Sequence, residues 1–129
     1  MSDLNTPHDY HGEIAKGLVL FLDPAEFGNS EVSHGAVPVQ GGHYFVCLGR
    51  SGSTLSRWFP VFSATDGKKT LLPGVKSGID HWTASSSYYY RNQVWTLEDA
   101  VVNAAAHADV ATQRGVRNLV ALPQDFDNI

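Results

Sequence analysis

The sequence predicts a mainly β domain, a small and strongly curved antiparallel barrel with a C-terminal alanine-rich helix. Short runs rich in aromatic and β-branched residues recur over the first 95 positions, which is typical of strands. Glycine-containing turns separate several of these runs, as they do in hairpins. An alanine-rich segment follows Thr96. Closely spaced strands joined by hairpins favour a curved antiparallel sheet or barrel.

The length of 129 residues fits a single domain. We assign this domain to residues 15–129 and expect the polar residues 1–14 to form a flexible N-terminal arm. No apolar run approaches the roughly 20 residues needed to cross a bilayer. The N-terminus lacks the pattern of a secretion signal, and the single cysteine cannot form an internal disulfide. These observations predict a cytoplasmic protein that makes no contact with membranes.

The first half of the chain contains two predicted strands. The apolar run 17–22 ends at Asp23-Pro24, which favours a buried strand and a turn. Residues 25–38 have no sustained period and form a predicted loop, of a length that is usually functional. The next strand covers 43–48 and is closed by a glycine- and serine-rich hairpin turn over 49–54.

Residues 57–63 form the next predicted strand, where Pro60 indicates an edge strand or a bulge. Asp66-Gly67 is a strong hairpin signal, and it predicts that a strand over 68–72 pairs with 57–63.

The last third of the chain contains a predicted strand over 88–95 and then a helix. Thr96 is the expected helix N-cap, the helix runs to about residue 113, and Gly115 is its expected C-cap. Residues 116–122 form a final strand or a helical turn.

Charge is distributed unevenly. The chain carries a net charge of −4, which argues against general nucleic-acid binding. Residues 49–96, however, hold six cations against two acids, whereas the segments on either side are acidic. The middle of the chain is therefore a basic segment, and its cations either form a binding surface or solvate separate faces.

Three short blocks resemble the MazF/PemK family of toxin ribonucleases. The first is the strand that ends in Phe21-Leu22-Asp23-Pro24, the second is Gln40-Gly41-Gly42-His43 with Val46-Cys47-Leu48, and the third is 92–97. With the segment around Pro60, the resemblance covers residues 17 to about 105. It implies an SH3-like barrel, a homodimer, single-stranded RNA as substrate, metal-independent endoribonuclease activity, and an antitoxin or other protein as partner in a toxin-antitoxin system.

Two positions depart from the family pattern. After the glycine turn the family commonly has an arginine and a proline, whereas this chain has Tyr44 and Phe45. Soon after the strand proline the family has a threonine or serine, whereas this chain has Phe62 and then Ser63. An arginine from elsewhere would then have to supply the cation. Without a metal or cofactor, RNA cleavage needs a base, an acid and donors to the phosphate. The predicted catalytic residues are His43, Ser63, Thr65 and Arg57, and the predicted substrate-binding residues are Arg50, His81, Tyr89 and Arg91.

Two alternatives stay open. The chain is a non-catalytic SH3-like protein-interaction module, or an enzyme of another class built around His43 and His81. Alternation along 88–93 places Tyr89 and Arg91 on one face, where we expect an exposed tyrosine and arginine pair. These residues also have a purely structural interpretation, in which the ring of His43 closes a turn and the tryptophans pack the core. We expect Cys47 to be a small buried hydrophobe.

Overall fold

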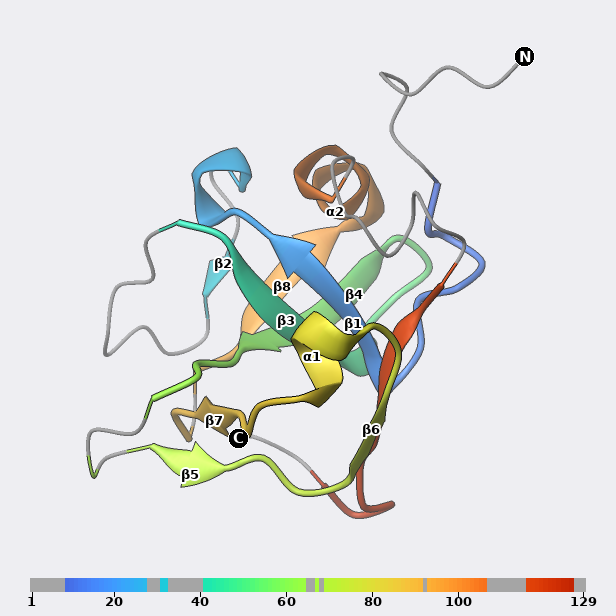
Figure 1. Cartoon of the computed structure of the whole chain (residues 1–129). Helices are drawn as coiled ribbons and strands as arrows, with labels where there is room; N and C mark the ends of the chain where they lie inside the picture. Colours follow the sequence, from blue (N-terminus) through green and yellow to red (C-terminus); the bar gives the residue numbers. More distant parts are fainter. Residues whose placement is uncertain are drawn as a thin grey trace.

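Antiparallel strands dominate the computed structural model, which describes residues 9–27, 31–32, 41–64, 67, 69–91, 93–106 and 116–126 (Figure 1). Within these residues seven strands form one sheet and two form another, and every pair is antiparallel. The large sheet runs in the order β2 (Glu31–Val32), β8 (Trp95–Glu98), β4 (Leu55–Pro60), β3 (His43–Arg50), β1 (Leu18–Leu22), β9 (Asn118–Ala121) and β6 (Val75–Ser77). The small sheet pairs β5 (Thr70–Leu71) with β7 (Tyr88–Tyr89). Among the described strands, β2 and β6 each pair on one side only, so this part of the sheet is open.

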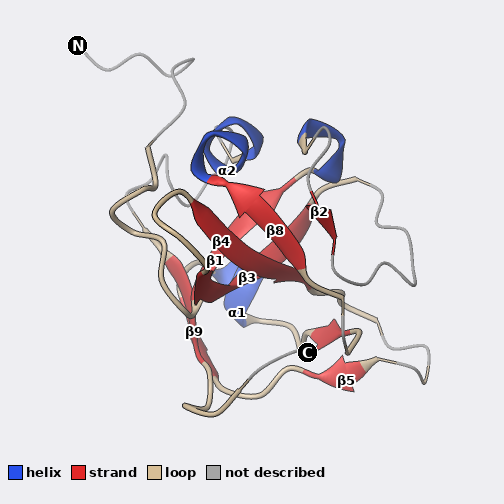
Figure 2. Ribbon diagram, turned by 180° about the vertical axis from the view of Figure 1, so that it is seen from behind, coloured by secondary structure: helices blue, strands red, loops and turns tan. Residues whose placement is uncertain are grey.

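Three short helices accompany the sheet in the described part of the chain: the 3-10 helix η1 (Pro24–Glu26), α1 (Asp80–Thr83) and α2 (Asp99–Ala105). Figure 1 shows α1 in front of β1 and β3, and Figure 2, seen from behind, shows it on the far side of the sheet. α2 lies at one end of the sheet in both views. None of the helices in the described segments is long and apolar enough to cross a membrane.

The sheet is apolar on both faces, and this explains the uninterrupted apolar run of β1. Leu18, Leu20 and Leu22 belong to one buried cluster, which includes Val102 of α2. Val19 belongs to a second cluster on the other face. Because successive side chains of a strand point to opposite faces, each face receives alternate residues. The second cluster packs around α1 and β7, and the candidate site lies on that face.

Several expected elements are confirmed. Strands occur at 18–22 and 43–50, and the turn after β3 leads into β4 as a hairpin. Of the two alternatives for 116–122, the strand is correct, because β9 pairs with both β1 and β6. Cys47, Trp58 and Trp82 are buried in the core as expected, and Trp95 is half-buried against it.

The pairing of the middle strands differs from the prediction. β4 is an internal strand, and Pro60 is its last residue. The pairs between β4 and β8 stop at Trp58, so the missing N–H of Pro60 costs no ladder hydrogen bond with β8. The bulge lies in β3, between Cys47 and Gly49. β5 pairs with β7 and not with β4, so the predicted pairing of 68–72 with 57–63 is wrong among the described residues, and Asp66 itself lies outside them.

The predicted strand 88–95 is two separate strands, β7 and β8, which belong to different sheets. Thr96 lies inside β8, and Glu98 takes the N-cap position of α2 without a side-chain capping bond. The expected helix end near residue 113 and its C-cap Gly115 lie outside the described residues.

Residues 9–14, which we assigned to the N-terminal arm, pack against the rest of the domain. Tyr10 is fully buried and Ile14 is 5% exposed, and both belong to the first core cluster. The backbone N–H of Tyr10 donates to Asn103 Oδ1 of α2 at 2.8 Å. An aromatic ring and a branched side chain in an otherwise polar segment thus fix residues 9–14 onto α2, and the remaining arm residues lie outside the described part of the chain.

Candidate functional site

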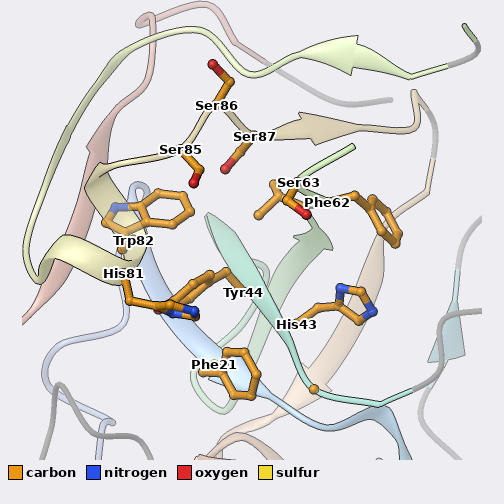
Figure 3. A pocket seen from close by; sticks show the side chains of 12 residues that line it. Phe21, His43, Tyr44, Phe62, Ser63, His81, Trp82, Ser85, Ser86 and Ser87 are labelled. Atoms are coloured by element: carbon orange, nitrogen blue, oxygen red, sulfur yellow. The ribbon is translucent and has the colours of Figure 1, made fainter. Parts of the chain in front are cut away.

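A pocket on the α1 side of the sheet gathers side chains from segments far apart in the sequence (Figure 3). Its volume is about 200 Å³, below the roughly 300 to 1,000 Å³ of pockets that enclose a whole small ligand. Such a pocket suits one part of a longer ligand. The described lining residues are Phe21, Gly42, His43, Tyr44, Val61, Phe62, Ser63, His81, Trp82, Ser85, Ser86 and Ser87.

His43 reaches the pocket from the first position of β3, where it pairs with Leu22 of β1. Its half-buried imidazole packs against Phe62, with 4.9 Å between the ring centroids. The preceding turn uses its two glycines differently. Gly41 has φ of +73°, a conformation that favours glycine, whereas a Cβ on Gly42 would lie 2.2 Å from the ring of Phe21. The glycine turn therefore presents His43 to the pocket.

His81 enters from α1 and is held by Tyr44. The Tyr44 hydroxyl and His81 Nδ1 lie 2.6 Å apart. The Tyr44 ring also packs against Trp82, with centroids 5.0 Å apart, and edge-on against Phe21 at 5.2 Å. This bond fixes the exposed imidazole of His81 through Nδ1, so Nε2 is the ring nitrogen that remains for a ligand. Tyr44 therefore has a clear structural role at the position where the resembling family would have an arginine.

Hydroxyl groups form the opposite wall of the pocket. Ser63 follows β4 directly after Phe62, and Ser85, Ser86 and Ser87 follow α1. Figure 3 shows Ser63 close to Ser87, across the pocket from His81 and His43. Three predicted site residues thus meet here: His43, Ser63 and His81.

The three predicted arginines do not line this pocket. Arg57 lies in β4 opposite Thr96 of β8, and Arg91 is exposed after β7. Arg50, at the end of β3, binds Asp99 through two hydrogen bonds of 3.1 and 3.2 Å. The expectation that an arginine from elsewhere would complete the site is therefore not met in the pocket.

Arg50 instead ties the N-terminal segment to α2. It donates to the carbonyl oxygen of His11 at 2.6 Å, and the His11 imidazole binds the same Asp99 carboxylate. Burial raises the pKa of Asp99, but the hydrogen bonds from His11 and Arg50 and their charges outweigh burial and hold this pKa below its ordinary value. His11, Arg50 and Asp99 therefore hold together the N-terminal segment, the end of β3 and the start of α2.

Tyr89 does not contribute as predicted. Tyr89 is 5% exposed and packs on Phe59 and Phe126, so the expected exposed pair with Arg91 is wrong. The strand there is only two residues long, and its buried face is the one that carries Tyr89. Thr65 lies outside the described residues.

Sequence reasoning missed two contributors to the pocket, Tyr44 and the serine segment. Tyr44 follows His43 directly, at a position where the family pattern draws attention to the absence of an arginine and not to the tyrosine itself. The run Ser85-Ser86-Ser87, shortly after His81, was a signal that could have been used, because it supplies three hydroxyl groups close in sequence to an imidazole.

In the described part of the chain, no three His, Cys, Asp or Glu side chains are grouped as a metal site would require. Comparison of the chain with protein-family models, with curated proteins and with solved structures found no match. The resemblance to the MazF/PemK family thus rests on the residues given above, and the function must be argued from the pocket.

Proposed function

We propose that this chain binds single-stranded RNA in the pocket and cleaves it without a metal ion. The observation that supports the proposal is that two imidazoles, those of His43 and His81, line the same pocket although they come from β3 and α1. The proposal includes the finer assignments implied by the resemblance: an SH3-like arrangement of strands, a MazF/PemK-like cytoplasmic toxin, a homodimer, and a protein antitoxin.

The chemistry needs two proton transfers. A base accepts the proton of the ribose 2′-hydroxyl as its oxygen attacks phosphorus, and an acid donates a proton to the departing 5′-oxygen. Imidazole can do either near neutral pH, because its unperturbed pKa is about 6.5. One imidazole starts neutral and the other protonated, the two transfers exchange these states, and proton exchange with water restores them. His81, held through Nδ1, has Nε2 as the nitrogen for its transfer.

Aromatic side chains beside the two imidazoles suit an unpaired nucleotide. Phe21 is 40% exposed and lines the pocket, and Phe62 lies next to His43. Lys69 Nζ lies 4.6 Å from the centre of the Phe62 ring. Exposed rings next to cations are the usual means of binding single strands, because bases stack on them while the cation attracts phosphate.

The decisive experiment is cleavage of single-stranded RNA by the purified protein in the presence of EDTA. General acid–base catalysis contributes about 10²- to 10⁴-fold, so His43→Ala and His81→Ala should each lower the cleavage rate by a factor in that range. His11→Ala is the matched control, because its imidazole binds Asp99 outside the pocket. Its rate should stay within about twofold of wild type, with thermal melting confirming that all three variants fold.

Absence of both cleavage and RNA binding at low salt would refute the proposal. Binding without cleavage, with His43→Ala unchanged, would support the alternative of a non-catalytic interaction module.

A further inference from the structure

Lys76 lies directly behind the pocket and organises its serine wall. It belongs to β6, the last strand of the described sheet. Its ammonium donates to the carbonyl oxygens of Trp82 at 3.0 Å and Ser85 at 2.6 Å, and to the hydroxyl oxygen of Ser87 at 2.6 Å. It also lies 3.9 Å from the centre of the Trp82 ring. One side chain thus holds the end of α1 and the segment that follows it.

The charge of Lys76 is not cancelled by these partners. An ammonium has three donors, and the three acceptors that receive them are all neutral. Partial burial lowers the pKa of Lys76, while the carbonyl oxygens and the Trp82 ring favour its charged form. The ammonium of Lys76 therefore places a positive charge next to the serine wall of the pocket.

The Ser87 hydroxyl connects the Lys76 ammonium with the pocket, because it accepts a hydrogen bond from the ammonium and also lines the pocket. Ser87 is 8% exposed, yet it lines the pocket. Because its oxygen accepts a hydrogen bond from Lys76, its own hydrogen must point elsewhere, and a donor polarised by an ammonium makes a stronger bond to an anion. Figure 3 shows the hydroxyl oxygens of Ser85 and Ser87 on the side facing Trp82 and Ser63, and that of Ser86 directed away.

The rest of the described lining also favours an anion. None of these lining residues is Asp or Glu, so no carboxylate of the wall repels a negative group. The two imidazoles add positive charge whenever they are protonated. An anion in this pocket would meet hydroxyl donors on one side and imidazoles on the other.

We propose that Ser87, polarised by Lys76, forms a subsite for a non-bridging oxygen of a phosphodiester. This inference rests on the proposed function, since it names the group that receives the phosphate charge in place of the missing arginine. Ser87 touches the phosphate oxygen, and Lys76 is a positioning residue that acts through it. The subsite would hold charge that develops on phosphate when the 2′-oxygen attacks.

The test measures binding and not turnover. The probes are inorganic phosphate and a 2′-O-methylated RNA oligonucleotide, which cannot be cleaved through its 2′-oxygen. A hydrogen bond to a charged group corresponds to about a 10- to 150-fold change in affinity, so Ser87→Ala should weaken both ligands by a factor in that range. Lys76→Met should weaken them similarly, and Lys76→Arg, which keeps the charge, should weaken them less.

Two controls match these variants. Ser51→Ala removes the hydroxyl of an exposed serine in the turn after β3, outside the pocket. Lys16→Met removes a lysine that also binds two backbone carbonyls, those of Gln124 and Phe126, outside the pocket. Both should bind like wild type. If Lys76→Met fails to fold, Ser87→Ala and Lys76→Arg carry the test.

The outcomes separate this inference from the proposed function. RNA cleavage by wild type, with Ser87→Ala binding no worse than Ser51→Ala, would overturn the subsite and leave the ribonuclease. Phosphate binding that requires Ser87 and Lys76, without RNA cleavage, would support the subsite and refute the ribonuclease. Binding of phosphate but not of the oligonucleotide would overturn the assignment to a phosphodiester.

Discussion

The single thiol of the chain offers a quantitative test of the core that positions the pocket. Cys47 is fully buried in the centre of β3, four residues after His43. Burial raises the pKa of Cys47 from 9.0 to about 12, against smaller lowering effects from the Gly49 N–H and Arg50. Since thiolates and not thiols attack disulfides and alkylating agents, the folded protein should be almost inert.

The size of the effect follows from the shift. At pH 8 a thiol with a pKa of 9.0 is about 10% thiolate, whereas one with a pKa of about 12 is about 0.01% thiolate, so reactivity falls about 10³-fold. Exclusion of the reagent lowers it further. The assay is the rate of reaction with an aromatic disulfide reagent at pH 8, in buffer and in guanidinium chloride. A folded-state rate within tenfold of the unfolded-state rate would refute both the burial and the register of β3.

The same experiment bears on mechanism. If the thiol is inert, prolonged treatment of the folded protein with iodoacetamide should leave RNA cleavage unchanged. Loss of cleavage in step with modification of Cys47 would point to thiol chemistry and against the pair of imidazoles.

Two further predictions concern stability. Gly78→Ala should destabilise the protein by about 1 to 3 kcal/mol in urea unfolding, because Gly78 has φ of +132° and a Cβ there would lie 2.8 Å from the Cα of Asn118. Gly49→Ala is its control, since Gly49 has φ of +124° with nothing within 4 Å of the new Cβ, and it should cost less; equal losses would contradict the steric argument. Asp99→Asn should cost about 1 to 3 kcal/mol at pH 7, because it weakens the pairing with Arg50. Since the pKa of Asp99 is lowered in the folded protein, this advantage of the wild type should be complete above about pH 4 and disappear as the pH falls further; a constant difference down to pH 2 would refute it.

Local patterns predicted the strands better than they predicted strand partners. The apolar run of β1 and the hairpin between β3 and β4 depend on neighbouring residues, and both were predicted. The partner of β5 depends on contacts across the chain, and the Asp66-Gly67 signal gave the wrong answer. A turn signal depends on neighbouring residues alone, whereas the strands that meet are selected by packing such as that of Tyr89 on Phe59 in the second core cluster.

The site residues, too, were predicted better where they depend on neighbouring residues than where they depend on contacts across the chain. His43 was predicted because the glycine turn and the strand that present it are adjacent in sequence. His81 was only one of several candidates, since the bond that brings it to Tyr44 spans 37 positions. Arg50 was predicted from its charge, but Asp99, 49 positions away, binds it outside the pocket. Sequence proximity within a basic segment therefore does not identify which cations face a ligand.

Tyr44 shows how a pocket without an arginine can still suit an anion. A guanidinium at this position would carry charge into the pocket directly, whereas the tyrosine hydroxyl holds His81, whose charge depends on its protonation. The constant positive charge comes instead from Lys76, which lies outside the pocket and donates a hydrogen bond to the Ser87 hydroxyl in its wall. A ligand would thus meet a permanent polarised donor on one side and two proton carriers on the other. This division would suit the proposed cleavage, because a side chain that gives up its proton also gives up the charge with which it would stabilise the phosphate.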